Sequence, residues 1–433
     1  MKHRRTQEPQ EGLKLPEGFL VGGTVGAHQT EGGDFHSDWW RWEQRPKRIA
    51  DGSTSETAAD HWNRHGADFA LARKLGLNAV FVSLSWARVC PEPDTVDAAA
   101  LAHYAEGFAG MRALGLTPVA ALHEVAAPRW FAEEGGWAAP RAAARFETYA
   151  RAALGALAPL CRDWIPVVEP EHWITRSQAE GAWPGRARGS RAPETIRRHL
   201  AAAHGAAARI LRALRPDARV GVSVRAFEVD PWDPDSPWDW QAADRLRHRL
   251  NHAFFEAAAR EEGGTPDFIA FSWGGSVRAG FSPLAARFSH AKVARDGAGF
   301  SLCLEDAPAD ADGFERALVA MSSHGVPVLV TGLPDAGEDD RVRCAQLRDH
   351  LERILRRTAE EPPLAVEGFF PQPLLDGFAW EKGFATGGGL LHVNRDTMAR
   401  TPNTTAYFLG DIAEHGEIRP GTAARYCGGE MRG

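Results

Sequence analysis

Residues 79–122 read AVFVSLSWARVCPEPDTVDAAALAHYAEGFAGMRALGLTPVAAL. The runs Ala79–Ser83 and Pro118–Leu122 at the two ends are short and almost wholly apolar, which is typical of parallel strands buried on both faces. Between them, the apolar residues of Ala98–Leu114 recur at the three- and four-residue spacing of an amphipathic helix. This stretch therefore predicts a strand–helix–strand unit of a parallel sheet.

The same alternation of patterns continues through the whole chain. The predicted strands are Phe19–Gly23, Ala79–Ser83, Pro118–Leu122, Trp164–Val168, Val220–Val224, Asp267–Ser272, Val328–Thr331 and Val366–Phe370. The predicted helices are Ala59–Leu75, Ala98–Leu114, Arg141–Leu160, Glu194–Leu214, Gln241–Glu261, Phe314–His324 and Arg341–Arg357. A long loop is predicted over Asp230–Trp240. Eight strands alternating with helices predict one α/β domain, a single (β/α)₈ TIM barrel over residues 15–415, between an N-terminal tail (1–14) and a C-terminal tail (416–433).

The composition limits the kind of partner that we expect. The formal net charge is −7 and 25% of the residues are charged, so the chain lacks the basic surface that nucleic-acid binding needs. The five cysteines are far apart in the sequence, and none has the spacing of a metal-binding motif, so we predict no metal and no cofactor. Met1–Gln10 has no apolar signal core, and no apolar run reaches the roughly 18 residues of a membrane span, which favours a cytoplasmic protein away from membranes. We expect a small-molecule ligand, and the sequence indicates no oligomeric state.

Five ordered motifs accompany the predicted strands. They read FLVGGTVGAHQTEG at residues 19–32, SLSWAR at 83–88, HEVAAPRW at 123–130, WIPVVEP at 164–170 and LLDGFAW at 374–380. In order and spacing they resemble the motifs of the family 1 glycoside hydrolases, a β-glucosidase-like family with a TIM-barrel fold. The resemblance runs from about Leu15 to Ile412. It implies a site for a glycoside-like small molecule at the C-terminal ends of the barrel strands.

The same resemblance assigns the catalytic positions. Retaining glycosidases use two carboxyl groups about 5–5.5 Å apart, one as acid/base and one as nucleophile. By resemblance, Glu169 is the acid/base, and Gly332 stands where the family carries its nucleophilic glutamate. Glycine cannot attack carbon, so we expect no classical retaining hydrolysis. Because Val168 and Phe81 are apolar, we expect Glu169 to lie in an apolar setting, suited to proton transfer.

Further departures from the family surround the missing nucleophile. They fall at Phe81, Glu124, Val168, Ser272–Gly274, Gln372–Pro373 and Ala379. Three positions still match the family's sugar-contacting residues, so Gln29, His123 and Trp380 are predicted to bind substrate. His123 and Glu124 are also candidate auxiliary groups in proton transfer. The alternative for Gln29 and Trp380 is packing at the barrel mouth, and for His123 a purely structural role in the core.

Three hypotheses about function remain open at the level of the sequence. In the first, Glu169 acts as general acid/base on a substrate less hydroxylated than glucose or on a natural-product scaffold. In the second, the barrel binds a small ligand without catalysis. In the third, it is a glycosidase with an inverting or substrate-assisted route. An inverting route needs a base about 6.5–9.5 Å from the acid, and Glu124, Asp335 or Glu381 would supply it.

Overall fold

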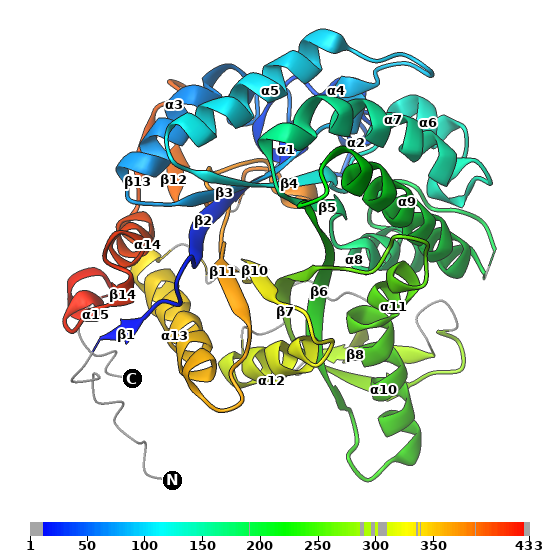
Figure 1. The fold of residues 1–433 in the computed structure, drawn as a ribbon. Helices are drawn as coiled ribbons and strands as arrows, with labels where there is room; N and C mark the ends of the chain where they lie inside the picture. The colour runs from blue at the N-terminus through cyan, green and yellow to red at the C-terminus, as the bar shows by residue number, and fades with distance from the viewer. Residues whose placement is uncertain are drawn as a thin grey trace.

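The structure is a computed structural model, which describes residues 12–189, 191–285, 290–295, 299–301, 310–334, 337, 339–385 and 387–427. Its centre is a closed barrel of eight parallel strands (Figure 1). These strands are β2 Leu20–Val25, β3 Ala79–Ser83, β4 Thr117–His123, β5 Asp163–Val167, β6 Arg219–Pro231, β7 Phe268–Phe281, β10 Val328–Gly332 and β11 Val366–Phe369. They pair in that order, and β11 closes the barrel by pairing with β2. The predicted (β/α)₈ barrel is therefore confirmed.

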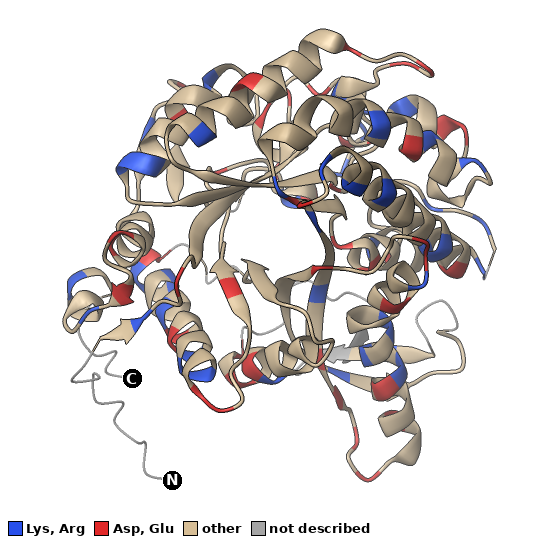
Figure 2. Ribbon diagram, in the orientation of Figure 1, with Lys and Arg blue, Asp and Glu red and all other residues tan. Residues whose placement is uncertain are grey.

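Helices cover the outside of the barrel (Figure 1). The longer ones are α3 His61–Lys74, α5 Ala98–Ala113, α7 Ala142–Leu157, α9 Ala192–Leu214, α10 Pro237–Asn251, α11 Ala253–Ala259, α12 Ala311–Ser322, α13 Asp340–Ala359 and α14 Thr404–His415. The shorter ones are α1 Ala27–Thr30, α2 Asp38–Glu43, α4 Trp86–Val89, α6 Arg129–Glu133, α8 Pro170–Ile174, α15 Thr422–Tyr426, η1 Gly136–Ala138, η2 Ala158–Leu160, η3 Thr175–Glu180 and η5 Trp380–Lys382. Charged residues gather on these helices and loops, and few lie on the barrel strands (Figure 2).

Two strands run well past the barrel wall, which the sequence did not predict. β6 and β7 stay paired as far as Pro231 and Ala279. β8 Ala291–Arg295 pairs with β7 in antiparallel fashion, and β9 Gly299–Ser301 pairs with β8 in the same way. The predicted loop Asp230–Trp240 is wrong at both ends, because β6 includes Pro231 and α10 begins at Pro237. Ser236 caps that helix by accepting a hydrogen bond from the Asp239 N–H. This extension has a small apolar core of its own, which includes Phe227, Leu246 and Val293.

One predicted helix, Gln241–Glu261, is two helices in the structure. α10 ends at Asn251 and α11 begins at Ala253, because His252 has a non-helical backbone conformation. α10 packs on the extension of β6 and β7, whereas α11 packs on α9. The two halves thus cover different layers of the molecule.

Two small sheets complete the fold. β1 Leu13–Lys14 pairs with β14 Glu417–Ile418, so the two ends of the described chain lie side by side. β12 Leu391–Val393 pairs with β13 Arg400–Pro402, and a bridge between Leu375 and Leu391 joins β12 to the loop that follows β11.

An inner layer of apolar side chains fills the barrel. It includes Phe81, Val119, Ala121, Ile165, Phe268, Ala270, Leu329 and Phe370. Side chains alternate between the two faces of a strand, so the residue two positions after an inward residue also points inward. This rule turns Ser83, His123 and Ser272 toward the barrel mouth, where the sites of TIM barrels lie.

Candidate active site

Glu169 lies at the barrel mouth, two residues after the end of β5, and is the N-cap residue of α8. Its φ of 43° is left-handed, a conformation that costs a non-glycine residue free energy and that is frequent in functional sites. Its side chain is 19% exposed, and Oε2 lies 3.9 Å from Nη1 of Arg225 on β6. The expected apolar setting is thus wrong in one respect, because a guanidinium faces this carboxylate. The sequence reasoning missed Arg225, although a charged residue inside a buried strand is itself a signal.

Glu124 directly follows β4 at the barrel mouth, and the pKa of its carboxyl group is raised. Its pKa is raised from 4.5 to about 7, mainly by burial, and the negative charge of Glu169 contributes to this rise. A hydrogen bond from the Ser83 hydroxyl and the positive charge of His28 act in the opposite direction. Two carboxyl groups that influence each other therefore meet at the mouth, and one of them keeps a proton near neutral pH.

Gly332 is the last residue of β10, and β7 places Ser272 directly opposite it. A Cβ built on Gly332 would lie 3.3 Å from the Ser272 Cβ and 3.4 Å from its Oγ, and would meet no other described residue within 4 Å. The backbone of Gly332 is not left-handed. Neither backbone conformation nor crowding therefore requires glycine here. Asp335, one of the three candidate bases, lies outside the described residues.

Gln29 sits on α1, close to Glu124. A Cβ on Gly26 would lie 2.4 Å from Gln29 Oε1 and 3.1 Å from Glu124 Oε2, so the two side chains converge where glycine leaves room. Gln29 also lines a cavity of about 160 Å³, together with Thr24, Gln372 and Ala379. Small-molecule sites usually enclose roughly 300–1,000 Å³, so this space fits a small ligand or one part of a larger one.

His123 is enclosed by aromatic rings. It is 3% exposed and packs against Trp86, Trp137 and Phe146. The Trp137 Nε1–H donates to His123 Nε2 at 3.3 Å. Burial lowers the His123 pKa to about 3, so the ring is neutral at physiological pH. This geometry favours the structural alternative for His123, and its contact with a substrate stays a prediction.

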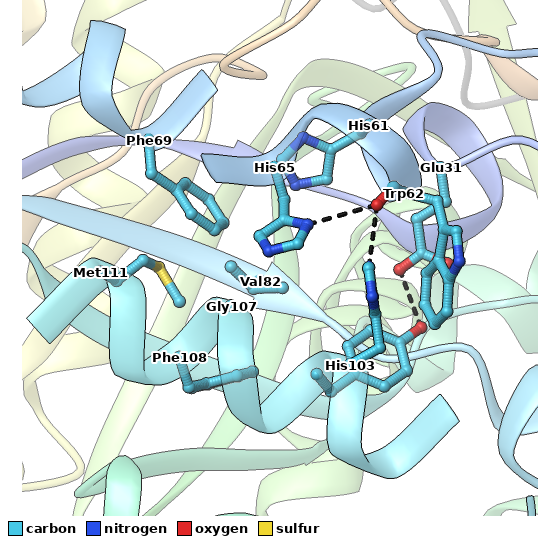
Figure 3. Close-up of a pocket in the computed structure, with 11 residues that line it drawn as sticks. Glu31, His61, Trp62, His65, Phe69, Val82, His103, Gly107, Phe108 and Met111 are labelled. Atoms are coloured by element: carbon cyan, nitrogen blue, oxygen red, sulfur yellow. Dashed lines mark hydrogen bonds between the residues drawn. The ribbon is translucent and has the colours of Figure 1, made fainter. Parts of the chain in front are cut away.

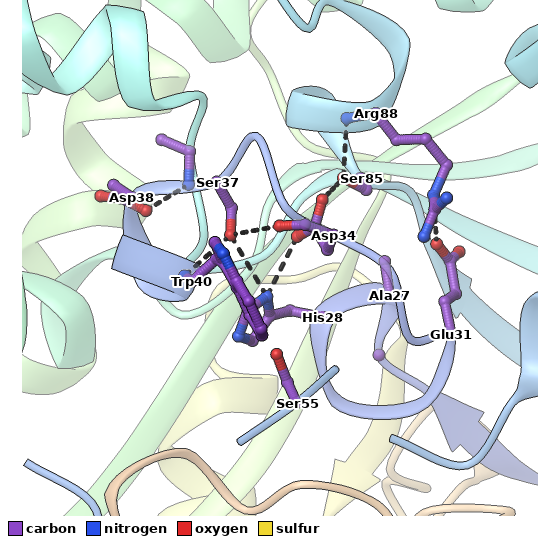
Figure 4. Close-up of polar contacts among 12 residues, drawn as sticks. Ala27, His28, Glu31, Asp34, Ser37, Asp38, Trp40, Ser55, Ser85 and Arg88 are labelled. Atoms are coloured by element: carbon purple, nitrogen blue, oxygen red, sulfur yellow. Dashed lines mark hydrogen bonds and ion pairs between the residues drawn. The ribbon is translucent and has the colours of Figure 1, made fainter. Parts of the chain in front are cut away.

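Trp380 is held by a buried charge network that the sequence reasoning did not find. Its ring stacks on His28, with centroids 5.6 Å apart and planes 4° apart. His28 Nδ1 lies 3.0 Å from Asp34 and Nε2 lies 3.4 Å from Glu43; Figure 4 shows His28 beside Asp34 and Ser37. Burial alone would lower the His28 pKa, but these two acidic partners outweigh it and raise the pKa to about 9. An imidazolium therefore lies behind the Trp380 ring.

Glu381, the next residue, is already occupied by partners. Its Oε1 accepts from Arg176, and its Oε2 accepts from the Trp183 indole N–H at 2.6 Å. A carboxylate held by an ion pair and an indole is poorly suited to deprotonate water. Of the three candidate bases, Glu124 is the one that the described structure places beside Glu169.

A second cavity lies away from the strand ends, between α3 and α5 (Figure 3). It holds about 30 Å³ and is lined by His61, His65, His103 and Phe108, among others. His65 Nδ1 and His103 Nε2 both hydrogen-bond the Trp62 carbonyl. This volume suits about one water molecule, so the cavity is a packing feature rather than a substrate site.

Among the described residues, no group of three or more His, Cys, Asp and Glu side chains is arranged to hold a metal ion. No described helix is long and apolar enough to cross a membrane.

Comparison with known proteins gives consistent matches. The model of the family described as glycosyl hydrolase family 1 matches residues 12–270 and 317–418. Thermostable β-glucosidase B of Thermobispora bispora is 26% identical over 460 residues, which cover 97% of this chain and 94% of that protein. β-Glucosidase 42 of Arabidopsis thaliana is also 26% identical and covers 91% of this chain and 93% of that protein. The solved β-glycosidase from Pyrococcus horikoshii has a TM-score of 0.86 at 25% identity and covers 96% of this chain and 98% of its own.

Proposed function

The chain belongs to glycosyl hydrolase family 1. We propose that it is a divergent member whose barrel mouth performs general acid–base chemistry. It does not perform retaining hydrolysis, because position 332 is glycine and not a nucleophilic glutamate. Glu169 and Glu124 are the two proton-transfer groups. A small glycoside-like or natural-product molecule is the substrate. The location in the cytoplasm stays a prediction from the sequence.

The observation that carries this proposal is the placement of Glu124 and Glu169 at the C-terminal ends of neighbouring barrel strands, where burial and the charge of Glu169 raise the Glu124 pKa to about 7. A proton-transfer group works best when its pKa lies near the operating pH. Two interacting carboxyl groups in unlike settings can divide the roles of acid and base. Here burial raises the pKa of Glu124, whereas Glu169 faces the guanidinium of Arg225.

The surroundings of the pair support a substrate with fewer hydroxyl groups than a hexose. Phe81 and Val168 are buried apolar side chains at 5% and 8% exposure, and Ala379 lines the cavity near Gln29. None of these side chains can hydrogen-bond a hydroxyl. A hydroxyl buried against them would lose its hydrogen bonds to water, at a cost of about 1–3 kcal/mol each.

The test is turnover of 4-nitrophenyl β-glycosides, with glucoside, galactoside and glucuronide in the panel. Wild type, Glu169→Gln and Glu124→Gln are compared by release of nitrophenol and by mass spectrometry of the products. General acid–base catalysis contributes about 10²–10⁴-fold, so each carboxyl variant should lose at least about a hundredfold. With azide as an external nucleophile, the wild type should form no glycosyl azide.

Each alternative gives a different result. Turnover that survives Glu169→Gln would contradict the proposal. A glycosyl azide from the wild type would show a sugar subsite intact except for its nucleophile. An inverted product that depends on Glu124 would identify the inverting route. Absence of turnover across the panel, with binding of the glycosides retained, would favour the non-catalytic barrel. Gly332→Glu is the matched control, because it restores a carboxylate at the nucleophile position. Retaining hydrolysis by this variant would mean that the mouth still recognises a sugar, which would contradict the proposal.

A further inference from the structure

Arg225 points into the barrel mouth from β6. Four residues earlier on the same strand, a Cβ on Gly221 would meet the Phe268 ring of the inner layer at 2.3 Å. Side chains an even number of positions apart share a face, so Arg225 also faces inward. The strand register places Arg225 opposite Ser272 and Ser272 opposite Gly332. These three residues therefore form a row across β6, β7 and β10 at the mouth.

The Arg225 guanidinium has little to bind within the described chain. Its nearest carboxylate oxygen, on Glu169, is 3.9 Å from Nη1, which is beyond hydrogen-bonding distance. Its buried Nε has no hydrogen-bond partner among the described residues. Arg219, at the start of the same strand, offers a contrast, because it reaches Asp163 at 2.8 Å and Glu367 at 2.7 Å. A guanidinium carries five N–H donors, and those of Arg225 are largely available to a ligand.

Space is available on the same row. At Gly332 no side chain occupies the end of β10, and a Cβ there would approach only Ser272. By the family resemblance, this is where a retaining enzyme carries a negatively charged glutamate. In this chain the positive charge of Arg225 is present and that negative charge is absent. The charged residues of the barrel strands are few (Figure 2), and the one carboxylate within 4 Å of Arg225 among the described residues, that of Glu169, makes no hydrogen bond to it.

We propose that Arg225 binds an oxyanion, a carboxylate or a phosphate, carried by the molecule that occupies the barrel mouth. The Ser272 hydroxyl is the second donor, and the ligand's anion takes up the space beside Gly332. Guanidinium groups bind such planar or tetrahedral oxyanions through paired N–H donors. This inference rests on the proposed function, because it names the substrate class of the same site.

The test measures binding, so that it does not depend on turnover. Glucuronate and glucose 6-phosphate are titrated calorimetrically into the 433-residue chain, with glucose as the uncharged reference. At least one anion should bind about tenfold more tightly than glucose, a difference of about 1.4 kcal/mol, because a hydrogen bond to a charged group is stronger than one between neutral groups. The preferred anion distinguishes a carboxylate from a phosphate substrate.

Variants assign the preference to its residue. Arg225→Gln should abolish the preference for the anion, Arg225→Lys should retain part of it, and Ser272→Ala should weaken it by less than Arg225→Gln does. Circular dichroism checks that each variant folds. If Arg225→Gln does not fold, the anion preference of Arg225→Lys and Ser272→Ala tests the proposal instead. Equal binding of glucose and both anions, no detectable binding of any of the three, or an unchanged preference in the variants would overturn the proposal.

The failure of this inference can be told apart from the failure of the proposed function. Glu169→Gln removes the only carboxylate within 4 Å of Arg225 among the described residues, so it should keep or strengthen anion binding while turnover is lost. Full turnover in Glu169→Gln would refute the proposed function and leave anion binding intact. A loss of turnover in Arg225→Gln with the anion preference unchanged would reduce Arg225 to a positioning residue for Glu169 and overturn the inference.

Discussion

Replacing His28 by glutamine should change the stability of the protein in a pH-dependent way. His28 is buried between Asp34 and Glu43, and these partners raise its pKa from 6.5 to about 9. Between these two pH values the folded state binds more protons at His28 than the unfolded state does, so the stability that His28 contributes is fully present below pH 6.5 and is lost as the pH rises through 9. The shift of about 2.5 pKa units corresponds to roughly 3 kcal/mol of unfolding free energy.

The assay is urea unfolding at intervals from pH 6.5 to 9.5, for wild type and His28→Gln. The difference in unfolding free energy between the two should be largest at the acidic end and shrink by up to about 3 kcal/mol at the alkaline end. His204→Gln is the matched control. That histidine is also buried and hydrogen-bonds the Gly264 carbonyl at 3.1 Å, but burial lowers its pKa to about 4, so its contribution should stay constant over this range.

A constant difference between wild type and His28→Gln across the range would refute the reasoning. It would mean that His28 is neutral in the folded protein and that Trp380 stacks on an uncharged ring. A slope in His204→Gln equal to that in His28→Gln would refute it as well, because the effect would then be common to buried histidines.

Further expectations concern Glu124 and two glycines. Burial raises the Glu124 pKa from 4.5 to about 7. The wild type should therefore lose up to about 3 kcal/mol of unfolding free energy relative to Glu124→Gln as the pH rises from 4.5 to 7. The difference in melting temperature between the two proteins should grow from about pH 5 to pH 8. Gly410→Ala should destabilise the fold by several kcal/mol or prevent it, because its Cβ would lie 1.7 Å from the Leu75 carbonyl oxygen. Gly332→Ala should stay within about 1 kcal/mol of the wild type in thermal unfolding, because only the Ser272 side chain must give way.

The barrel could be predicted from the sequence because its strands are buried on both faces. The predicted run Ala79–Ser83 is β3 residue for residue, and all five of its residues are buried. The extension of β6 and β7 could not be predicted in the same way. One of its strands ends in a Pro- and Asp-rich segment at Pro231 that reads as a loop, and only pairing with β7 makes it a strand.

The sequence could predict the site residues that lie in the family-like motifs, but not the residues outside those motifs. Glu169 and Glu124 follow predicted strands, so their place at the mouth could be anticipated. Arg225 could have been found from the inward alternation on β6, had that strand's register been known. His28 could not, because Asp34 and Glu43 lie six and fifteen residues further on and only the folded loop brings them to its ring.

The most direct test of the central claim is the pKa of Glu124 itself, measured by a carboxyl-resolved infrared or NMR titration. In the wild type the Glu124 carboxyl group should titrate near 7, as should that of Asp38, whose pKa burial also raises to about 7, and only the Glu124 signal should be absent from Glu124→Gln. In Glu169→Gln the same group should titrate at a lower pH, because the negative charge that helps it keep its proton is gone. A Glu124 pKa near the ordinary 4.5, or one unchanged by Glu169→Gln, would contradict the claim that these two carboxyl groups form a coupled acid–base pair.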